Sequence, residues 1–108
     1  MLAKEYRLPA DVNTKGFLTF LTPLFTLKVG ENRESRSRFG FIISNGIEKS
    51  AVRRNRVKRQ YRRFVEERCS KIITGHDFLF ILKRGSVDKK SEEINDSIEK
   101  VFKKEGFI

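Results

Sequence analysis

Cysteine, histidine and tryptophan are nearly absent from this chain of 108 residues, which has one Cys, one His and no Trp. A single cysteine, Cys69, excludes an internal disulfide and favours a reducing compartment. Cys69 and the lone His76 cannot by themselves form a zinc site or a Cys-His nucleophile pair, so we expect both to be structural. A glycine-rich phosphate loop is missing as well. The sequence therefore predicts neither a catalytic constellation nor a metal site within the chain.

Long apolar runs are also missing. The N-terminal stretch MLAKEYRLPADV has no apolar core of signal-peptide length, and no segment approaches the length of a membrane span. We therefore expect a soluble, cytoplasmic protein without a membrane partner.

Negative charge is scarce relative to positive charge. The 24 lysines and arginines outnumber the 14 acids and give a net charge of +10. Such a surface attracts polyanions, nucleic acid first and anionic membrane second. Ten phenylalanines supply apolar surface for a core, and the length suits one domain, so a single globular domain is expected over residues 1–108.

Three segments have the composition of β-strands. They are residues 23–29, 39–44 and 76–83, and the last two are apolar on both faces, as in central strands. The polar loop 30–38 makes a hairpin of the first two strands the expected pairing. Three arginines lie among the two acids of that loop: Arg33, Arg36 and Arg38. Contact of these arginines with RNA is as good an interpretation as simple solvation.

Helical periodicity marks two further segments. One helix is expected over about residues 50–73, with Ser50 as its N-cap, and another over about residues 91–104. At most one short helical stretch fits within residues 9–16, between a proline and a glycine. The predicted order is therefore (short α)-β-β-α-β-α, an α+β fold with one small sheet.

The segment AVRRNRVKRQYRRF, residues 51–64, carries seven cations within eleven positions and no acid. On a helical wheel the apolar residues gather on one side: Val57, Tyr61, Phe64, Val65 and Ile72. Basic and amide side chains gather on the opposite side: Asn55, Arg56, Arg59, Arg62 and Arg63. One interpretation is a solvated helix face, but such faces usually mix both signs of charge in i, i+4 pairs. An external polyanion that supplies the missing negative charge is the better interpretation.

RNA is the favoured polyanion. A basic helix that binds membranes needs bulky apolar groups toward the lipid, and in this helix the core requires them. A helix-turn-helix protein that binds DNA would be mostly helical, whereas this chain has strong strands. Guanidinium groups would donate to phosphates, and Asn55 could contact a base edge or a ribose hydroxyl. The candidate RNA-binding residues are Arg53, Arg54, Asn55, Arg56, Lys58, Arg59, Arg62 and Arg63.

The stretch SAVRRNRVKRQYRR resembles the signature of the bacterial ribonuclease P protein subunit. The matching residues are Ala51, Arg54, Asn55, Arg56, Val57, Lys58, Arg59 and Arg62. The segments YRL, RFGFIIS and HDFLFILKRG occur in the order and spacing of that family, so the resemblance covers most of the chain, from about Arg7 to Phe102.

This resemblance implies a fold and a function. The fold would be an α+β sandwich with a small mixed sheet and a left-handed β-α-β crossover. The protein would be the accessory subunit of a ribonucleoprotein endoribonuclease that removes the 5′ leader of precursor tRNA. The RNA subunit would carry the active site and its Mg²⁺, the basic helix would contact that RNA, and a cleft beside the sheet would hold the leader. The free protein is expected to be monomeric.

Three departures from the family pattern bear on these expectations. The family's first helix is longer, so Phe17 or Phe20 would stand in as a cleft wall in this chain. Ser44 is followed by Asn45 and Gly46, where the family usually has two lysines. Tyr61 replaces an aliphatic residue, and its inward phase predicts packing rather than altered function.

The strand phenylalanines are candidates for either core or leader stacking, because spacing leaves open which side of the sheet faces the helices. The complete set of leader-cleft candidates is Phe17, Phe20, Phe25, Phe39, Phe41, Phe78 and Phe80. Stacking would contribute roughly 1–3 kcal/mol per base.

An alternative function is that of a ribosomal or other structural RNA-binding protein, although the strand-helix-strand context of the motif argues against it. A nuclease that acts alone is disfavoured, since no catalytic cluster is apparent.

Overall fold

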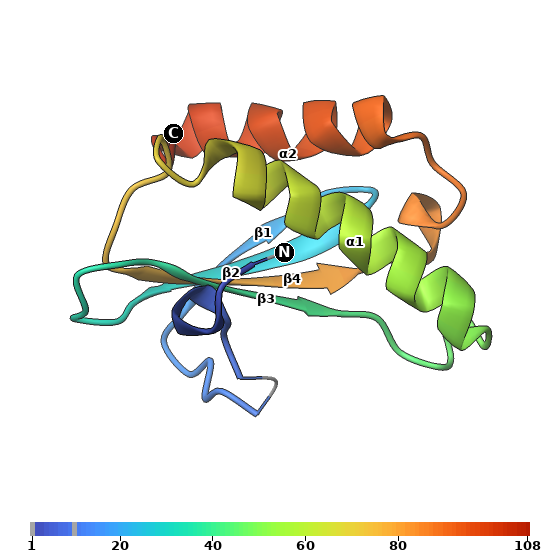
Figure 1. Ribbon diagram of the computed structural model, residues 1–108, viewed down its shortest axis with the longest axis horizontal. Coiled ribbons are helices and arrows are strands. Elements are labelled where there is room, and N and C mark those ends of the chain that lie inside the picture. Colours follow the sequence, from blue (N-terminus) through green and yellow to red (C-terminus); the bar gives the residue numbers. More distant parts are fainter. Residues whose placement is uncertain (1, 10) are drawn as a thin grey trace.

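The computed structural model describes residues 2–9 and 11–108. Figure 1 shows two layers, with both α-helices lying over one face of a four-stranded sheet. The strands are β1 (Leu18–Leu21), β2 (Phe25–Glu31), β3 (Arg38–Ile42) and β4 (His76–Leu82). The helices are α1 (Ala51–Arg68) and α2 (Ser91–Glu105), with short 3-10 turns η1 (Lys4–Tyr6) and η2 (Arg84–Ser86). The predicted α+β class is confirmed, and so is the predicted β-β-α-β-α order, which β2, β3, α1, β4 and α2 follow.

The strand order is β1-β2-β4-β3, in which β2 is antiparallel to both β1 and β4, and β3 is parallel to β4. The predicted hairpin of β2 and β3 is therefore wrong, because β4 lies between them. Of the two segments expected to be central, residues 76–83 supply β4, which is central. Residues 39–44 supply most of β3, which is an edge strand, so the expectation for that segment is wrong. The N-terminal chain covers this edge by bridging Arg7 to Phe39. The edge strand β1 escaped prediction because it is only four residues long and leaves Leu18 and Leu21 exposed.

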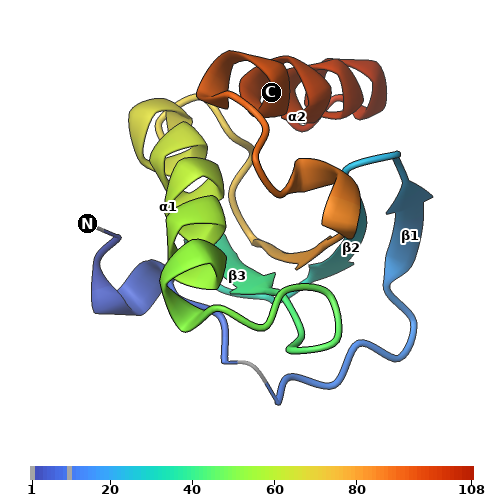
Figure 2. The same ribbon diagram turned by 90° about the vertical axis from the view of Figure 1, so that its right-hand side faces the viewer.

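The connection from β3 through α1 to β4 joins two neighbouring parallel strands. With α1 toward the viewer and β3 pointing upward, β4 lies to the left of β3, as Figures 1 and 2 together show. The crossover is therefore left-handed, against the usual right-handed rule. This agrees with the expectation drawn from the family resemblance.

Helix α1 begins as predicted and ends earlier than predicted. The Ser50 side chain accepts a hydrogen bond from the backbone N–H of Arg53 and so caps the helix. The helix ends at Arg68, five residues before the expected end, because the chain turns there and buries Ile72 in the core. Among described residues 9 and 11–16 no helix forms, and the N-terminal chain instead bridges Arg7 to Phe39 beside β3.

The helices cover the sheet face formed by alternate residues of each strand. Cross-strand pairing aligns Leu27 with Phe80, and Phe80 with Phe41, on that face. Side chains buried there with 0% exposure include Phe25, Leu27, Tyr61, Phe64, Phe78, Phe80 and Phe102. Ring contacts at 5.4–6.1 Å between centroids link sheet and helices, for example Phe25 with Tyr61 and Phe78 with Phe102. This core holds the apolar side of α1 against the sheet.

The opposite sheet face is partly covered by the N-terminal segment. Leu8 lies over Gly40, where an added Cβ would come within 3.3 Å of the Leu8 Cβ. The ring of Phe17 lies over Gly30, and an added Cβ at that glycine would overlap it. Figure 1 shows the blue chain that leads into β1 below the sheet, on the side away from both helices.

Tyr61 places a hydroxyl group inside the core, on the buried side of α1. Its side chain is 0% exposed, and among the described residues its hydroxyl has no hydrogen-bond partner of ordinary geometry. Burial raises the pKa of Tyr61 to about 12, and the Ser86 hydroxyl offsets this rise only in part. The Ser86 hydroxyl itself donates to the carbonyl oxygen of Lys83, at 2.8 Å. The inward packing predicted for Tyr61 is confirmed.

The apolar side of α1 provides a test of the fold. Val57 is 2% exposed, and Val52 of the same helix is 78% exposed. We expect Val57→Asp to destabilise the protein by on the order of 3 kcal/mol or more, because it buries an unpaired charge. The matched control Val52→Asp should change stability by no more than about 0.5 kcal/mol. Thermal melts of both variants measure this, and equal losses would contradict the burial of Val57.

Tyr61 provides a test by pH. Below pH 10, Tyr61→Phe should be as stable as the parent or slightly more stable, because it removes a buried unpaired hydroxyl. An unfolded tyrosine ionises near pH 10 whereas the buried one resists until about pH 12, so the parent loses stability between these values. The difference should reach roughly 2–3 kcal/mol in favour of Tyr61→Phe. Urea unfolding at several pH values tests this, and parallel profiles of the two proteins would refute it.

Candidate nucleic-acid interface

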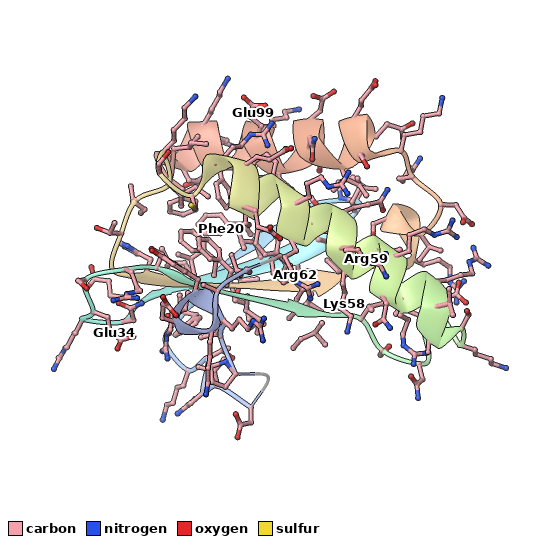
Figure 3. The ribbon with its side chains drawn as sticks, viewed as in Figure 1. Phe20, Glu34, Lys58, Arg59, Arg62 and Glu99 are labelled. Carbon is pink, nitrogen blue, oxygen red and sulfur yellow. The ribbon has the colours of Figure 1, made fainter. Side chains whose placement is uncertain are left out.

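The outer side of α1 presents a basic face. Asn55, Arg56, Arg59 and Arg63 are exposed, and Lys58 is half-buried beside them. None of these cations has an ion-pair partner among the described residues. Figure 3 shows Lys58, Arg59 and Arg62 extending from the side of α1 that faces the viewer. We call Asn55, Arg56, Lys58, Arg59 and Arg63 the α1 basic face.

Two arginines of the same segment, Arg53 and Arg54, instead make contacts within the protein. Arg53 forms ion pairs with Glu48, at 3.5 Å, and with Asp88. The Arg54 guanidinium donates to the carbonyl oxygens of Glu48 and Lys49, both at 2.8 Å. These contacts fasten the start of α1 to the preceding loop and to the segment before α2. The helical wheel could not separate them from the α1 basic face, because it carries no information about loops distant in the sequence.

Arg62 lies at the border between the α1 basic face and a cleft. Its guanidinium carbon is 5.7 Å from the centroid of the Phe41 ring on β3, which is a cation–π contact. Phe41 itself is half-buried, and its ring stacks on Phe80 at 5.4 Å. Arg62 thereby connects the helix surface with the edge of the sheet.

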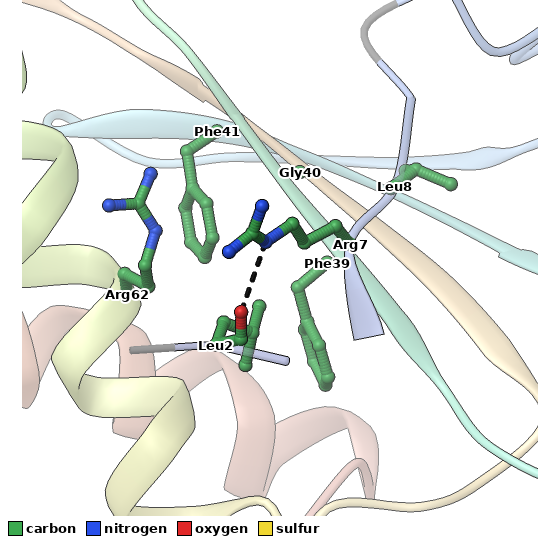
Figure 4. Close-up of a pocket in the computed structure, with 7 residues that line it drawn as sticks. All are labelled: Leu2, Arg7, Leu8, Phe39, Gly40, Phe41 and Arg62. Carbon is green, nitrogen blue, oxygen red and sulfur yellow. Dashed lines mark hydrogen bonds between the residues drawn. The ribbon is translucent and has the colours of Figure 1, made fainter. Parts of the chain in front are cut away.

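The cleft lies between α1, β3 and the N-terminal segment, and has a volume of about 270 Å³. Figure 4 shows Arg62 and Phe41 on one side and Leu2 and Arg7 on the other. Arg7 Nε donates to the Leu2 carbonyl oxygen at 3.0 Å, which fixes the guanidinium at the cleft. Aromatic carbon and guanidinium groups therefore line one hollow, a combination that suits unpaired nucleotides. We call this hollow the Arg7–Arg62 cleft.

Sequence reasoning did not single out Leu2 and Arg7 as functional residues. Leu2 is 5% exposed although it lies at the start of the chain, and Arg7 forms a bridge with Phe39. In the sequence, Arg7 belongs to the YRL segment of the family resemblance, which assigns it no role.

The structure places the phenylalanine candidates in three environments. Phe25, Phe78 and Phe80 are fully buried and Phe39 is 3% exposed, so they form the floor beneath the cleft or the core. Phe41 retains a partly exposed ring at the cleft. The remaining two lie elsewhere: Phe17 is on the opposite sheet face, and Phe20 packs on Phe107 with ring centroids 5.6 Å apart. Stacking of the leader on any of them stays a prediction.

The turn at Asn45 and Gly46 has a cation nearby. The Arg84 guanidinium donates to the carbonyl oxygen of Gly46 at 3.4 Å, so positive charge lies beside this turn.

Cys69 is exposed at the end of α1, and His76 Nδ1 lies 2.9 Å from the Thr74 carbonyl oxygen. Within the described part of the chain, no three His, Cys, Asp or Glu residues are grouped for metal binding. No helix in residues 2–9 and 11–108 is long and apolar enough to cross a membrane.

Comparison with known proteins gives a consistent result. The sequence model of the Ribonuclease P family matches residues 15–106. A ribonuclease P protein component from Pelotomaculum thermopropionicum is 38% identical over 74 residues, which cover 68% of this chain and 65% of that relative. One from Clostridium kluyveri is 34% identical over 90 residues, or 82% of this chain and 80% of that relative.

Solved structures show the same fold. A Staphylococcus aureus RNase P protein mutant superposes with a TM-score of 0.86 at 24% identity, over 97% of this chain and 92% of that one. The Thermotoga maritima RNase P protein gives a TM-score of 0.81 at 19% identity, over 91% and 96% of the two chains. With the family match over residues 15–106 and the fold in agreement, the chain belongs to the ribonuclease P protein family, the accessory subunits of a ribonucleoprotein endoribonuclease.

Proposed function

We propose that this subunit binds the ribonuclease P RNA through the α1 basic face and holds the 5′ leader of precursor tRNA in the Arg7–Arg62 cleft. The observation that supports the first part is the set of exposed cations on α1 without an ion-pair partner among the described residues. Phosphates would supply the missing negative charge through charge-assisted hydrogen bonds. The Asn55 amide, exposed between Arg54 and Arg56, can donate to and accept from a base or ribose.

The cleft suits a single strand of variable sequence. Stacking on Phe41 requires only the flat face of a base, and the Arg7 and Arg62 guanidinium groups can donate to phosphates on either side of that base. Every nucleobase has such a face, so a leader of any sequence can occupy the cleft. Phe39 then acts as the buried floor rather than as a stacking partner.

In this proposal the protein contributes binding, and the RNA subunit contributes the chemistry together with its Mg²⁺, as the resemblance implies. Contacts with the leader exist in the precursor and are lost once the leader has been removed. They therefore favour substrate over mature product, which helps the enzyme bind precursor and release tRNA. The cations of α1 also reduce repulsion between the two RNA molecules at low Mg²⁺.

Three coarser features belong to the same proposal. Residues 1–108 form one ribonuclease P protein domain, the free protein is a monomer, and it works in the cytoplasm, where precursor tRNA is made. A continuous core from Leu2 to Phe107 supports a single domain. The net charge of +10 supports a monomer, because like-charged copies repel. The alternative of a ribosomal or other structural RNA-binding protein is not favoured, since the matched relatives are ribonuclease P protein components.

A cleavage assay tests the proposed function. The purified protein alone should not cut precursor tRNA, and a bacterial ribonuclease P RNA alone should cut slowly at low Mg²⁺. The two together should cut faster at the same 5′ site, because the protein adds leader contacts and neutralises phosphate charge. Specific cleavage by RNA-free protein, or no gain in rate upon mixing, would overturn the proposal.

The α1 basic face provides a second test. Arg59→Ala should leave the melting temperature nearly unchanged, because surface changes usually alter stability by no more than about 0.5 kcal/mol. Binding to ribonuclease P RNA should weaken, and the log–log salt slope should flatten by roughly 0.7–0.9 for one lost phosphate contact. Lys104→Ala removes an exposed cation from α2 and serves as the matched control. RNA titrations at several salt concentrations measure both, and equal effects of the two variants would contradict a specific RNA-binding face.

A further inference from the structure

We infer that a second basic groove, on the far side of Arg7 from the cleft, binds phosphates of the leader where it extends past the cleft. This inference rests on the proposed leader binding in the Arg7–Arg62 cleft. The groove lies between η1 and the loop that joins β2 to β3, with a volume of about 550 Å³. Its cations are Lys4, Arg7, Arg33, Arg36 and Arg38.

The charges of this groove do not cancel. Arg38 makes two hydrogen bonds to Asp77, at 2.9 and 2.8 Å, and is thereby neutralised. Arg36 lies 3.6 Å from Glu5 and over the ring of Tyr6, at 5.6 Å from its centroid. Lys4 and Arg33 have no ion-pair partner among the described residues. Against five cations stand Glu5, Glu34 and the buried Asp77, so the groove attracts an anion.

The loop that carries these arginines is held in one conformation by buried polar groups. Asp77, which is 4% exposed, accepts hydrogen bonds from Arg38 and from Asn32 Nδ2, the latter at 2.9 Å. Asn32 in turn donates to the Arg36 carbonyl oxygen and accepts from the Glu34 N–H. The Ser37 hydroxyl donates to the Ile73 carbonyl oxygen at 2.6 Å and accepts from the His76 N–H at 3.1 Å.

Arg33 occupies the left-handed backbone region, with φ of 61°, which side-chain-bearing residues other than Asn and Asp rarely adopt. Such a conformation persists where the surrounding hydrogen bonds over-determine it, as they do in this loop. A loop that is already ordered loses little conformational freedom when it binds, so its cations are effective toward phosphate.

The groove and the cleft form one continuous path. Arg7 lines both hollows, and Arg62 lines both the cleft and the hollow beside Arg59 and Arg63. Along β3, Arg38 is three residues from Phe41, roughly 10 Å at the usual rise of a strand, and the two side chains leave opposite faces of the sheet. A single strand that stacks on Phe41 therefore reaches the groove by passing Arg7 at the free edge of β3.

The position of the groove favours the leader over the catalytic RNA as its occupant. Figure 1 shows the loop between β2 and β3 at the left end of the sheet and the start of α1 at the right end. The groove thus lies at the opposite end of the molecule from the beginning of the α1 basic face, and is connected to it through the cleft. A flexible single strand can follow this path from the cleft to the groove. A rigid duplex that binds α1 cannot bend to follow it.

The test uses the assembled holoenzyme and precursor tRNAs with leaders of graded length, at fixed ionic strength. The variant is Arg33→Gly combined with Arg36→Ala, because glycine accepts the left-handed backbone while it removes the guanidinium. The parent should gain affinity in two steps as the leader lengthens, first at the cleft and then at the groove. The variant should keep the first step and lose the second, a loss of roughly threefold to tenfold for long leaders only.

Two control variants separate the outcomes. Phe41→Ala should reduce the first step, and its failure to do so would count against the proposed leader cleft rather than against the groove. Lys104→Ala, an exposed cation on α2, should affect neither step. The groove proposal is overturned if the parent shows no second step, if the groove variant binds all leaders like the parent, or if it weakens binding equally at every length. Weaker binding to ribonuclease P RNA in the absence of precursor would assign the groove to the catalytic RNA instead.

Discussion

Burial of one side of α1 against the sheet is the constraint on which the rest of this structure depends. Val57, Tyr61, Phe64 and Val65 are all at most 2% exposed and lie over the phenylalanines of β2 and β4. A helix has only one rotation about its axis that buries these four residues, so the opposite side must face solvent. The α1 basic face is therefore oriented by the core, and no interaction among the arginines themselves is needed to position it.

Acids near the α1 basic face and the groove are paired with arginines that hold the fold. Glu48 and Asp88 engage Arg53 at the start of α1, and Asp77 engages Arg38 at the start of β3. Hydrogen bonding to Asp77 raises the pKa of Arg38, so this guanidinium stays charged and fixed. The arginines of the α1 basic face have no such partners among the described residues. The positions of the acids thereby separate the cations that hold the fold from those of the α1 basic face, although their side chains are chemically alike.

The N-terminal segment forms one wall of the Arg7–Arg62 cleft. Leu2, Arg7 and Leu8 of this segment line the cleft. The segment follows the free edge of β3 through a bridge to Phe39 and buries Leu2 among core side chains. It also covers part of the otherwise open edge of the sheet, which reduces unwanted strand pairing. A short 3-10 turn and an extended bridge to β3 thus build this wall.

Local periodicity in the sequence determined the helix start at Ser50, the inward side of α1, the strands β2, β3 and β4 and the basic character of the surface, because each depends on neighbours within a few residues. The separation of Arg53 and Arg54 from Arg56 and Arg59 depended on Glu48 and Asp88, whose positions follow from loop packing. Only the tertiary structure decided that β4 lies between β2 and β3, and that Phe41 keeps a partly exposed ring while Phe80 has none. Strand pairing and cleft formation join residues that are dozens of positions apart, and no local pattern of side chains specifies which distant segment will be the neighbour.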